Sequence, residues 1–273
     1  MNDIAHLKEI ATRARIDCLK TIHKAKSGHP GGSLSAMDIL TVLYFHTLRI
    51  DPKDPKGPDR DRFILSKGHA APALFTILAH RGFFPLSELD SFRQTQGNLQ
   101  GTINIHIPGG DMTTGSLGQY LSVGAGMALA GRMDGRDYKV YVLLGDGELQ
   151  EGQVWEAAMA SASFELGRLI AIVDKNKVQQ SGPTDEIMRL GDVESKFGAF
   201  GWKVVRIDGH DIERIVAALD AIPDQPRGMP TVIIADTIKG KGVSFMEGKA
   251  EWHGGAPSDE QLAQALAELG GTK

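Results

Sequence analysis

Oxygen-bearing side chains follow two apolar runs of the sequence, and their spacing suits a divalent cation. Val140–Leu144 leads straight into Gly145-Asp146-Gly147-Glu148, and the apolar run 169–173 leads into Asp174-Lys175-Asn176. Glycines let a backbone approach a ligand, and a helix that begins just beyond favours a bound phosphate. The Asp146 carboxylate would repel a phosphate unless a cation lay between them. Mg²⁺ takes such oxygen ligands, so we expect Asp146, the Asn176 amide thirty positions later and a nearby backbone carbonyl to bind it.

Several basic side chains also lie on glycine-rich turns. His29 and His69 each precede an expected helix, and a neutral imidazole there can both donate and accept protons, although a lone loop histidine is more often a surface or capping residue. Lys239 and Lys241 follow the apolar run 231–235, where a contact near an active site and a simple surface position are both open. His210 is equally open, because it follows Asp208-Gly209 in a turn.

The elements that must position these residues alternate between strand and helix from residue 139 onward. Apolar runs predict strands at 140–144, 169–173, 203–207 and 231–235. Helical patterns lie at 151–165, 195–200, 211–221 and 259–269, the last of them capped by Ser258. This alternation predicts an α/β fold with a doubly wound, mostly parallel sheet flanked by helices. Ligands bind such sheets at the carboxyl ends of the strands, which is where the candidate residues lie.

The first half of the chain is less regular. Helices are expected at 4–26, from Ser33 to Phe45, at 70–81 and at 115–130, with a short strand at 63–65. Residues 93–114 are polar, glycine-rich and aperiodic, and they read as a long ordered loop of the kind that is usually functional.

Composition narrows the class of protein. The 273 residues carry a net charge of −4, so a basic nucleic-acid-binding face is not expected. A single cysteine excludes a disulfide framework and fits a reducing, cytoplasmic compartment, and no apolar run reaches the ~18 residues of a membrane span. Glycine is enriched, at 33 of 273 residues. The length is that of one large domain or two small ones.

The Gly-Asp-Gly stretch with its distant Asn resembles the thiamine diphosphate-dependent enzymes, and four more motifs resemble transketolases in their order along the chain. These motifs are KSGHPGG (26–32), DRFILSKGH (61–69), TTGSLGQ (113–119) and WHGGAP (252–257). The resemblance implies a single thiamine diphosphate-binding domain over residues 1–273 that binds the diphosphate through Mg²⁺, Ca²⁺ or Mn²⁺. The implied metal ligands are the side chains of Asp146 and Asn176 and the carbonyl of Val178.

The resemblance also implies roles for other residues. The implied cofactor contacts are Gly115, Ser116, Leu117, Gly145, Gly147, Glu148, Asn176, His69, His253 and Lys239. His29, His69 and His253 are implied to contact the reacting cofactor and sugar. Glu151 and Glu156 are implied to link two active sites across a dimer interface, although five positions on a helix place them about 140° apart, and solvated surface acids are the alternative.

One loop departs from the family pattern. Transketolases generally carry His-Pro after the glycine that corresponds to Gly101, and here Thr102-Ile103 replace it. His106 follows a few residues later as a candidate substitute. We therefore expect an altered donor or acceptor preference.

We expect the pyrimidine-binding and C-terminal domains of the family to lie on a separate chain. The resemblance implies the N-terminal subunit of a split transketolase, which transfers a two-carbon ketol unit between phosphorylated sugars. A partner chain would carry the activating glutamate, in an α₂β₂ assembly. Two alternatives stay open: a pyruvate-using enzyme related to 1-deoxyxylulose-5-phosphate synthase, and a non-catalytic subunit that binds thiamine diphosphate.

Overall fold

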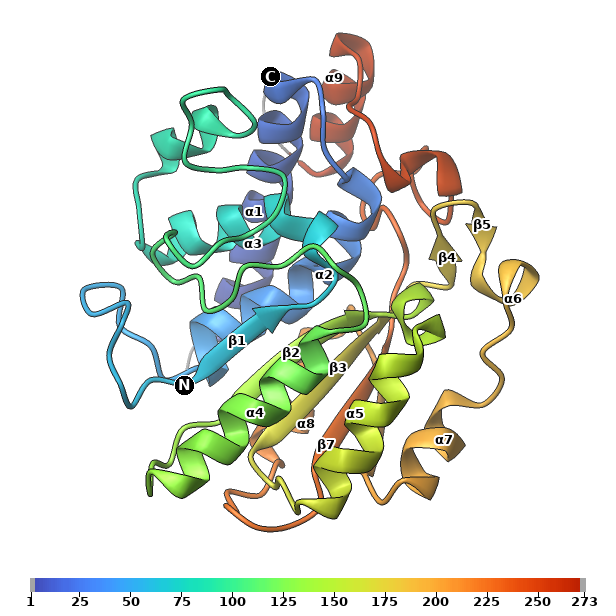
Figure 1. Ribbon diagram of the computed structural model, residues 1–273. Helices are drawn as coiled ribbons and strands as arrows, with labels where there is room; N and C mark the ends of the chain where they lie inside the picture. Colours follow the sequence, from blue (N-terminus) through green and yellow to red (C-terminus); the bar gives the residue numbers. More distant parts are fainter. Residues whose placement is uncertain (1–2, 271–273) are drawn as a thin grey trace.

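A parallel sheet forms the centre of the molecule (Figure 1). The computed structural model describes residues 3–270. Within them, five strands pair in the order β1-β2-β3-β7-β6, and every neighbouring pair is parallel. The strands are β1 (Arg62–Leu65), β2 (Val140–Gly145), β3 (Leu169–Lys175), β6 (Lys203–Asp208) and β7 (Thr231–Asp236). The predicted α/β class and parallel sheet are confirmed.

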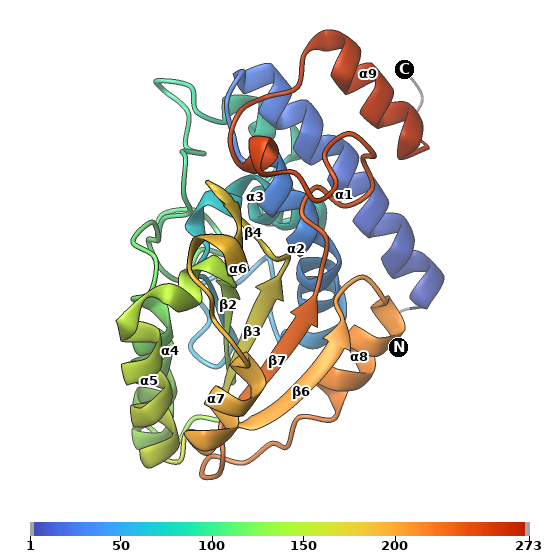
Figure 2. The same cartoon turned by 90° about the vertical axis from the view of Figure 1, so that its right-hand side faces the viewer.

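Helices cover both faces of this sheet (Figure 2). In chain order they are α1 (Ile4–Ala25), α2 (Pro30–Val42), α3 (Ala71–Arg81), α4 (Tyr120–Met133), α5 (Gly152–Ser163), α6 (Thr184–Ile187), α7 (Val193–Ala199), α8 (Ile212–Asp220) and α9 (Asp259–Glu268). Short helical turns lie at Leu43–Thr47, Gly68–Ala70, Leu86–Ser91 (η3), Gly147–Gln150 and Ala250–His253.

The two faces of the sheet bury alternate residues of the same strands. Tyr141 and Leu143 of β2 pack in one core with α1, α2, α3 and α8, whereas Val142 and Leu144 pack in a second core with α4, α5 and α7. Because successive side chains point to opposite faces, a strand covered on both faces must be apolar throughout. This is why the apolar runs predicted the central strands well.

The helix predicted at 115–130 begins later than the sequence indicated. Gly115 has a φ of +155° and Gly118 a φ of +86°, and α4 starts only at Tyr120. A methyl group at Gly118 would also lie 2.5 Å from Cβ of Glu151. Residues 115–119 are therefore a tight approach to the helix rather than part of it.

Other boundaries shift by a few residues. The helix expected from Ser33 starts at Pro30, since proline is well suited to the first helical turn. Ser258 caps α9, as predicted, and the structure shows that it does so in a complete capping box with Gln261. Nothing in the sequence indicated the small antiparallel pair β4 (Val178–Gln179) and β5 (Gly182–Pro183).

The long segment 93–114 contains no helix or strand, as predicted. Leu99, Ile103 and Ile107 are buried in the core and anchor it. No helix within residues 3–270 is long and apolar enough to cross a bilayer. The outermost residues of the predicted 1–273 domain, 1–2 and 271–273, lie outside the described part of the chain.

Candidate functional site

A cavity of about 240 Å³ lies at the carboxyl ends of β2, β3 and β7. Its walls come from distant segments of the chain, which the parallel sheet brings to one edge. They include most of the residues that the sequence singled out: Lys67, His69, Leu117, Gly145, Asp146, Gly147, Glu148, Gln150, Glu151, Asn176, Val178, Gln179, Gln180, Lys239 and His253.

Asp146 is the acidic centre of the cavity. It is buried, and its two carboxylate oxygens accept hydrogen bonds from the backbone N–H of Gly147 at 2.8 Å and of Lys177 at 2.5 Å. Burial and the neighbouring Asp174 carboxylate raise the pKa of Asp146 above its ordinary value. A buried carboxylate that is costly to ionise is stabilised by a bound cation, so Asp146 fits the role of a metal ligand.

The other two predicted metal ligands lie beside it on the same wall. The Asn176 amide oxygen accepts a hydrogen bond from Val178 N–H at 3.1 Å, and its amide nitrogen lies 3.5 Å from Ser35 Oγ. The Val178 carbonyl accepts a hydrogen bond from Lys239 Nζ at 2.9 Å. A carboxylate, an amide oxygen and a carbonyl suit Mg²⁺. The Val178 carbonyl oxygen has a second lone pair, so a cation could share this oxygen with the Lys239 ammonium group.

Lys239 is nearly fully buried, so the alternative of a simple surface lysine is excluded. Burial and the nearby Lys67 charge lower the pKa of Lys239 to about 8. Its Nζ also lies 2.9 Å from His253 Nδ1. The lysine therefore presents a cation on the cavity wall, where it can meet an anionic ligand. Lys241, by contrast, lies 3.6 Å from Glu247 in an ion pair away from the cavity.

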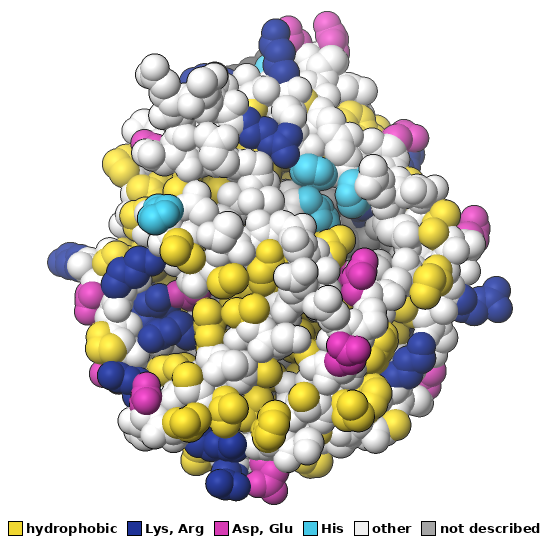
Figure 3. Space-filling view, viewed as in Figure 1, with side chains coloured by type: hydrophobic (Ala, Val, Ile, Leu, Met, Phe, Trp, Pro, Cys, Tyr) yellow, Lys and Arg dark blue, Asp and Glu magenta, His cyan; other side chains and the backbone are white. Residues whose placement is uncertain are grey.

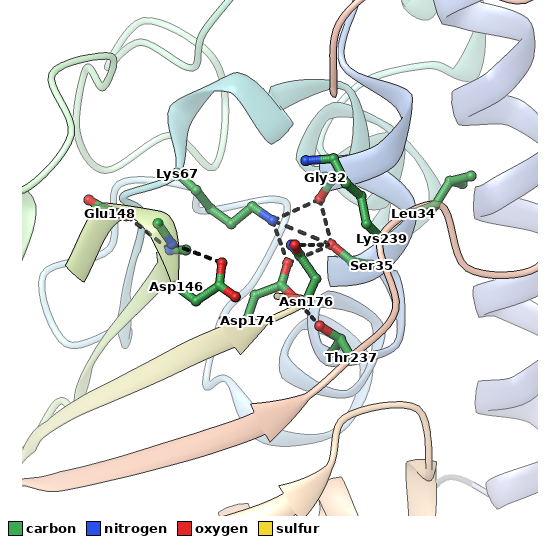
Figure 4. Close-up of polar contacts among 12 residues, drawn as sticks. Gly32, Leu34, Ser35, Lys67, Asp146, Glu148, Asp174, Asn176, Thr237 and Lys239 are labelled. Atoms are coloured by element: carbon green, nitrogen blue, oxygen red, sulfur yellow. Dashed lines mark hydrogen bonds and ion pairs between the residues drawn. The ribbon is translucent and has the colours of Figure 1, made fainter. Parts of the chain in front are cut away.

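A buried ion pair beneath the cavity was not predicted from the sequence. Lys67 Nζ pairs with the fully buried Asp174 carboxylate and donates to the Gly32 carbonyl at 2.9 Å (Figure 4). Ser35 and Thr237 donate to the same carboxylate. Burial alone would raise the pKa of Asp174, but these partners outweigh it and lower the pKa. Such a pair is worth most as a rigid support, because breaking it would leave an uncompensated buried charge.

Glu148 has a supporting position as well. Its carboxylate accepts hydrogen bonds from Ser66 Oγ, from Gly118 N–H at 2.9 Å and from Gly145 N–H at 3.0 Å. Burial raises its pKa despite these donors. Glu148 thus ties the end of β1 and the approach to α4 to the turn after β2, besides lining the cavity.

Three histidines meet at the upper rim of the cavity, in the hollow where histidine side chains gather in Figure 3. The ring centroid of His69 lies 5.4 Å from that of His29 and 4.9 Å from that of His253. Burial and neighbouring cations lower the pKa of His29 and His253 to about 4, and burial with the Lys67 charge lowers the pKa of His69 well below its ordinary value. All three rings are therefore neutral near pH 7.

These rings can approach because small residues lie between their segments. A methyl group at Gly32 would lie 3.0 Å from His69 Nε2. At Gly31 it would meet the Trp252 carbonyl oxygen at 2.6 Å. Within the described residues, His29 Nδ1 is buried and has no hydrogen-bond partner. An unpaired polar atom beside two other imidazoles marks a place for a polar ligand group.

Gly115, Ser116 and Leu117 lie on the open side of the site. Gly115 and Ser116 are exposed, and Ser116 N–H donates to the Tyr120 hydroxyl at 3.2 Å. Leu117 lines the cavity and keeps 40% of its surface exposed. This side of the site is therefore uncovered in the single chain.

Glu151 and Glu156 do not share a helix as the spacing suggested. Glu151 is the N-cap of α5 with an extended backbone, so the angular estimate does not apply to it. Both carboxylates are exposed, and Glu151 lies on the cavity rim.

The loop at residues 99–106, which departs from the family pattern, does not place a histidine in the cavity. Thr102 lies beside Gly115, where its methyl carbon is 3.8 Å from the Cβ position of that glycine. Ile103 is buried in the core. His106 is exposed and lines a separate hollow with Asn98 and Pro108. His106 therefore does not line the cavity at the carboxyl ends of the strands.

Lys67, Asp174 and Ser35 are the site residues that sequence reasoning missed. Lys67 stands inside the 61–69 motif and Asp174 at the end of an apolar run, so both carried a positional signal. Their pairing depends on a contact between residues 107 positions apart, which the spacing of motifs does not reveal. Among residues 3–270, no group of three or more His, Cys, Asp or Glu side chains could hold a metal by itself, so any metal needs amide or carbonyl oxygens too.

Comparison with known proteins consistently finds transketolases. Residues 6–272 match the family described as transketolase, thiamine diphosphate binding domain. The chain is 45% identical to one of the subunits of an apulose-4-phosphate transketolase from Phocaeicola vulgatus, covering 92% of this chain and 89% of that protein. It is 46% identical to the 6-deoxy-6-sulfo-D-fructose transketolase subunit SqwG from a Clostridium species, covering 92% of this chain and 91% of that one.

Longer transketolases match over only part of their length. The human enzyme is 41% identical over 96% of this chain, which spans 41% of the human protein. The crystal structure of transketolase from Campylobacter jejuni superimposes with a TM-score of 0.92 at 33% identity, covering 99% of this chain and 43% of that one.

Proposed function

The chain belongs to the transketolase family as a thiamine diphosphate-binding domain, and from this premise we propose that it is the diphosphate-binding subunit of a two-chain transketolase. With its partner it transfers a two-carbon ketol unit between phosphorylated sugars. The observation that carries the proposal is the cavity at the carboxyl ends of β2, β3 and β7. There Asp146, Asn176 and Lys239 converge with the neutral rings of His69 and His253, and the ring of His29 packs against these two.

In this proposal Asp146, Asn176 and the Val178 carbonyl would hold a divalent cation, which would offset the negative charge of the cofactor diphosphate. The support is the donor set itself and the raised pKa of Asp146, which a cation would relieve. Gly145 and Gly147 give the diphosphate access to the backbone, and Lys239 contributes a cation beside the Val178 carbonyl. Glu148 and the Lys67–Asp174 pair keep these groups in place.

Thiamine diphosphate, when bound, supplies an electron sink for the carbanion that forms as the sugar carbon–carbon bond breaks. The chain's own residues bind and orient the substrate. Because they are neutral, His29 and His69 can each accept a hydrogen bond from one sugar hydroxyl and donate one to another. His253, whose Nδ1 lies 2.9 Å from Lys239 Nζ, can instead donate through Nε2. The unpaired Nδ1 of His29 is available for this purpose.

The partner chain covers the open side of the site. Leu117 and Glu151 line the cavity and are exposed. An apolar surface lies over α4 and α5 (Figure 3). We call this surface the α4–α5 face; its exposed apolar side chains are Leu117, Met133, Met159 and Phe164. Exposed apolar patches of this kind mark protein interfaces. We propose that it docks the chain with the pyrimidine-binding domain in an α₂β₂ assembly, in which Glu151 and Glu156 face the neighbouring subunits.

The natural sugars are a separate proposal. Two relatives of matching length carry names that refer to apulose 4-phosphate and to 6-deoxy-6-sulfo-D-fructose. In this chain Thr102 stands near Gly115 and no histidine of the loop reaches the cavity. We propose that the altered loop shifts the donor or acceptor preference. Equal efficiency on xylulose 5-phosphate plus ribose 5-phosphate and on every other pair tried would count against it.

A product assay on the partnered enzyme tests the proposed reaction. Ketol transfer between sugar phosphates, lost when the divalent cation is chelated and restored by Mg²⁺, is the expected result. Release of CO₂ from pyruvate would favour the pyruvate-using alternative. Metal-dependent binding of thiamine diphosphate by calorimetry, without turnover in any partnered form, would favour a non-catalytic role.

A further inference from the structure

A chain of buried polar contacts runs from α1 through α2 to the turn that carries Lys239. Arg15 of α1 pairs with Asp38 of α2 through two hydrogen bonds, at 2.9 Å and 2.6 Å. Asp38 also lies 2.8 Å from His210 Nδ1. His210 Nε2 lies 2.8 Å from the backbone nitrogen of Ile238. These side chains of Arg15, Asp38 and His210 are each about a tenth exposed or less.

The protonation pattern of His210 follows from its partners. An amide N–H can only donate, so His210 Nε2 must be the unprotonated acceptor for Ile238. The proton then lies on Nδ1, which donates to the Asp38 carboxylate. Arg15 in turn holds Asp38 in one orientation. The network therefore fixes both the tautomer and the direction of the imidazole ring.

The turn that His210 contacts lies between β7 and the cavity. Thr237 supports Asp174 from this turn, and Lys239 reaches the Val178 carbonyl and His253. Gly209 lets the turn after β6 approach, because a methyl group there would lie 2.5 Å from Cγ2 of Thr237. Through its Ile238 N–H, this turn is hydrogen-bonded to His210, which lies in the loop after β6.

We propose that His210 is a positioning residue, which sets the Thr237–Lys239 turn so that the Lys239 ammonium group meets the cofactor diphosphate. The role of Lys239 rests on the proposed function, whereas the contact between His210 and Ile238 does not. His210 lines no wall of the cavity and touches no reacting atom. It acts through the backbone of Ile238.

Two substitutions separate the two contacts of the ring. His210→Asn keeps a donor near the position of Nδ1 and loses the acceptor for Ile238. His210→Gln places its amide oxygen near the position of Nε2, so it can still accept from Ile238. The full chain is used for amide hydrogen exchange at Ile238 and for calorimetric titration with Mg²⁺ and inorganic diphosphate. Amides of β3 serve as the internal control for an intact fold.

We expect His210→Asn to speed exchange at Ile238 by about tenfold and to weaken binding of magnesium diphosphate by a similar factor. His210→Gln should remain within about threefold of the natural chain in both measurements. Unchanged Ile238 exchange and affinity in His210→Asn would overturn the inference. So would an equal loss in both variants, or loss of β3 protection, since each would assign His210 to general stability. Failure of the natural chain to bind magnesium diphosphate would contradict the proposed function instead.

Discussion

At the scale of a single residue, the buried Asp146 carboxylate lowers the stability of the free chain but suits the residue for binding a cation. Its carboxylate is buried beside Asp174, and two backbone N–H groups and the Lys67 charge counter only part of that cost in the single chain. A cation would remove the remaining penalty. The residue is thus arranged for a ligand rather than for the stability of the free protein.

We predict that Asp146→Asn stays folded but loses at least about a hundredfold in affinity for magnesium diphosphate, equivalent to ~2.7 kcal/mol. Asparagine removes an unfavourable buried charge, but its amide N–H group would face a backbone N–H donor where a carboxylate oxygen now accepts, so the two effects on stability oppose each other. Calorimetry with a thermal unfolding control measures both. An affinity within about threefold of the natural chain would contradict the metal assignment.

His29 gives a pH dependence whose sign can be worked out. Its pKa lies at about 4 in the folded chain against an ordinary value of 6.5. Between these values the unfolded chain binds more protons, so the free energy of unfolding falls as the pH falls through this window. Well above pH 6.5 the ring is neutral in both the folded and the unfolded chain, so it has no effect on the pH dependence of the free energy of unfolding.

We predict that His29→Asn loses less stability than the natural chain between about pH 7.5 and pH 5. Urea unfolding at the two pH values provides the measurement, and the difference between the two proteins isolates this histidine from the carboxylates. Parallel losses in both proteins would show that His29 is not held neutral by its surroundings.

At the scale of elements, the start of α2 must pack closely against the segment that follows β7. A methyl group at Gly31 would meet the Trp252 carbonyl oxygen at 2.6 Å and Lys239 Cγ at 2.9 Å. The first of these contacts is with backbone, which cannot rotate away. The position therefore links the packing of α2 to the placement of Lys239.

We predict that Gly31→Ala destabilises the chain by about 1–3 kcal/mol and weakens binding of magnesium diphosphate. Gly198→Ala is the matched control, because a methyl group at this position in α7 has no neighbour within 4 Å and alanine favours the helix by ~0.5–1 kcal/mol. Urea unfolding of both variants measures the difference in their free energies of unfolding. Equal stability of the two would contradict the packing described here.

How much the sequence predicted also differs between elements. The strands were predicted well because burial on both faces makes them continuously apolar, and Ser258 marked the start of α9. The predicted start of α4 was wrong. Gly115 and Gly118 have a positive φ that a helix does not allow, but from composition alone they look like part of a glycine-rich helix. The candidate metal ligands came to one cavity because parallel strands end at one edge, whereas the Lys67–Asp174 pair needed the three-dimensional fold.

At the scale of the whole molecule, the chain forms one layered α/β fold whose site is open on one side. It matches two transketolase subunits over most of their length and spans 41% of the human enzyme. The family prediction of a split transketolase is confirmed by these relatives. The length and charge of the sequence could not reveal this, and the motifs could.

We predict that Met159→Glu leaves the stability of the isolated chain within about 0.5 kcal/mol, because Met159 on α5 is 57% exposed. On the α4–α5 face the new charge should weaken binding to the partner by about a hundredfold. Leu86→Glu is the control, since Leu86 is 49% exposed on η3, which packs against α1 and α3. Light scattering and calorimetry with the partner measure assembly; equal binding by both variants would contradict the proposed face.

The most direct measurement is the initial rate of ketol transfer by this chain, by its partner and by their mixture, each with thiamine diphosphate and Mg²⁺. The partner is the chain that carries the pyrimidine-binding domain, to be sought in the neighbouring reading frame. We predict transfer by the mixture, no transfer by either chain alone, and loss of the mixture's activity in Asp146→Asn. Substantial ketol transfer by this chain alone, or none by the mixture, would contradict the account.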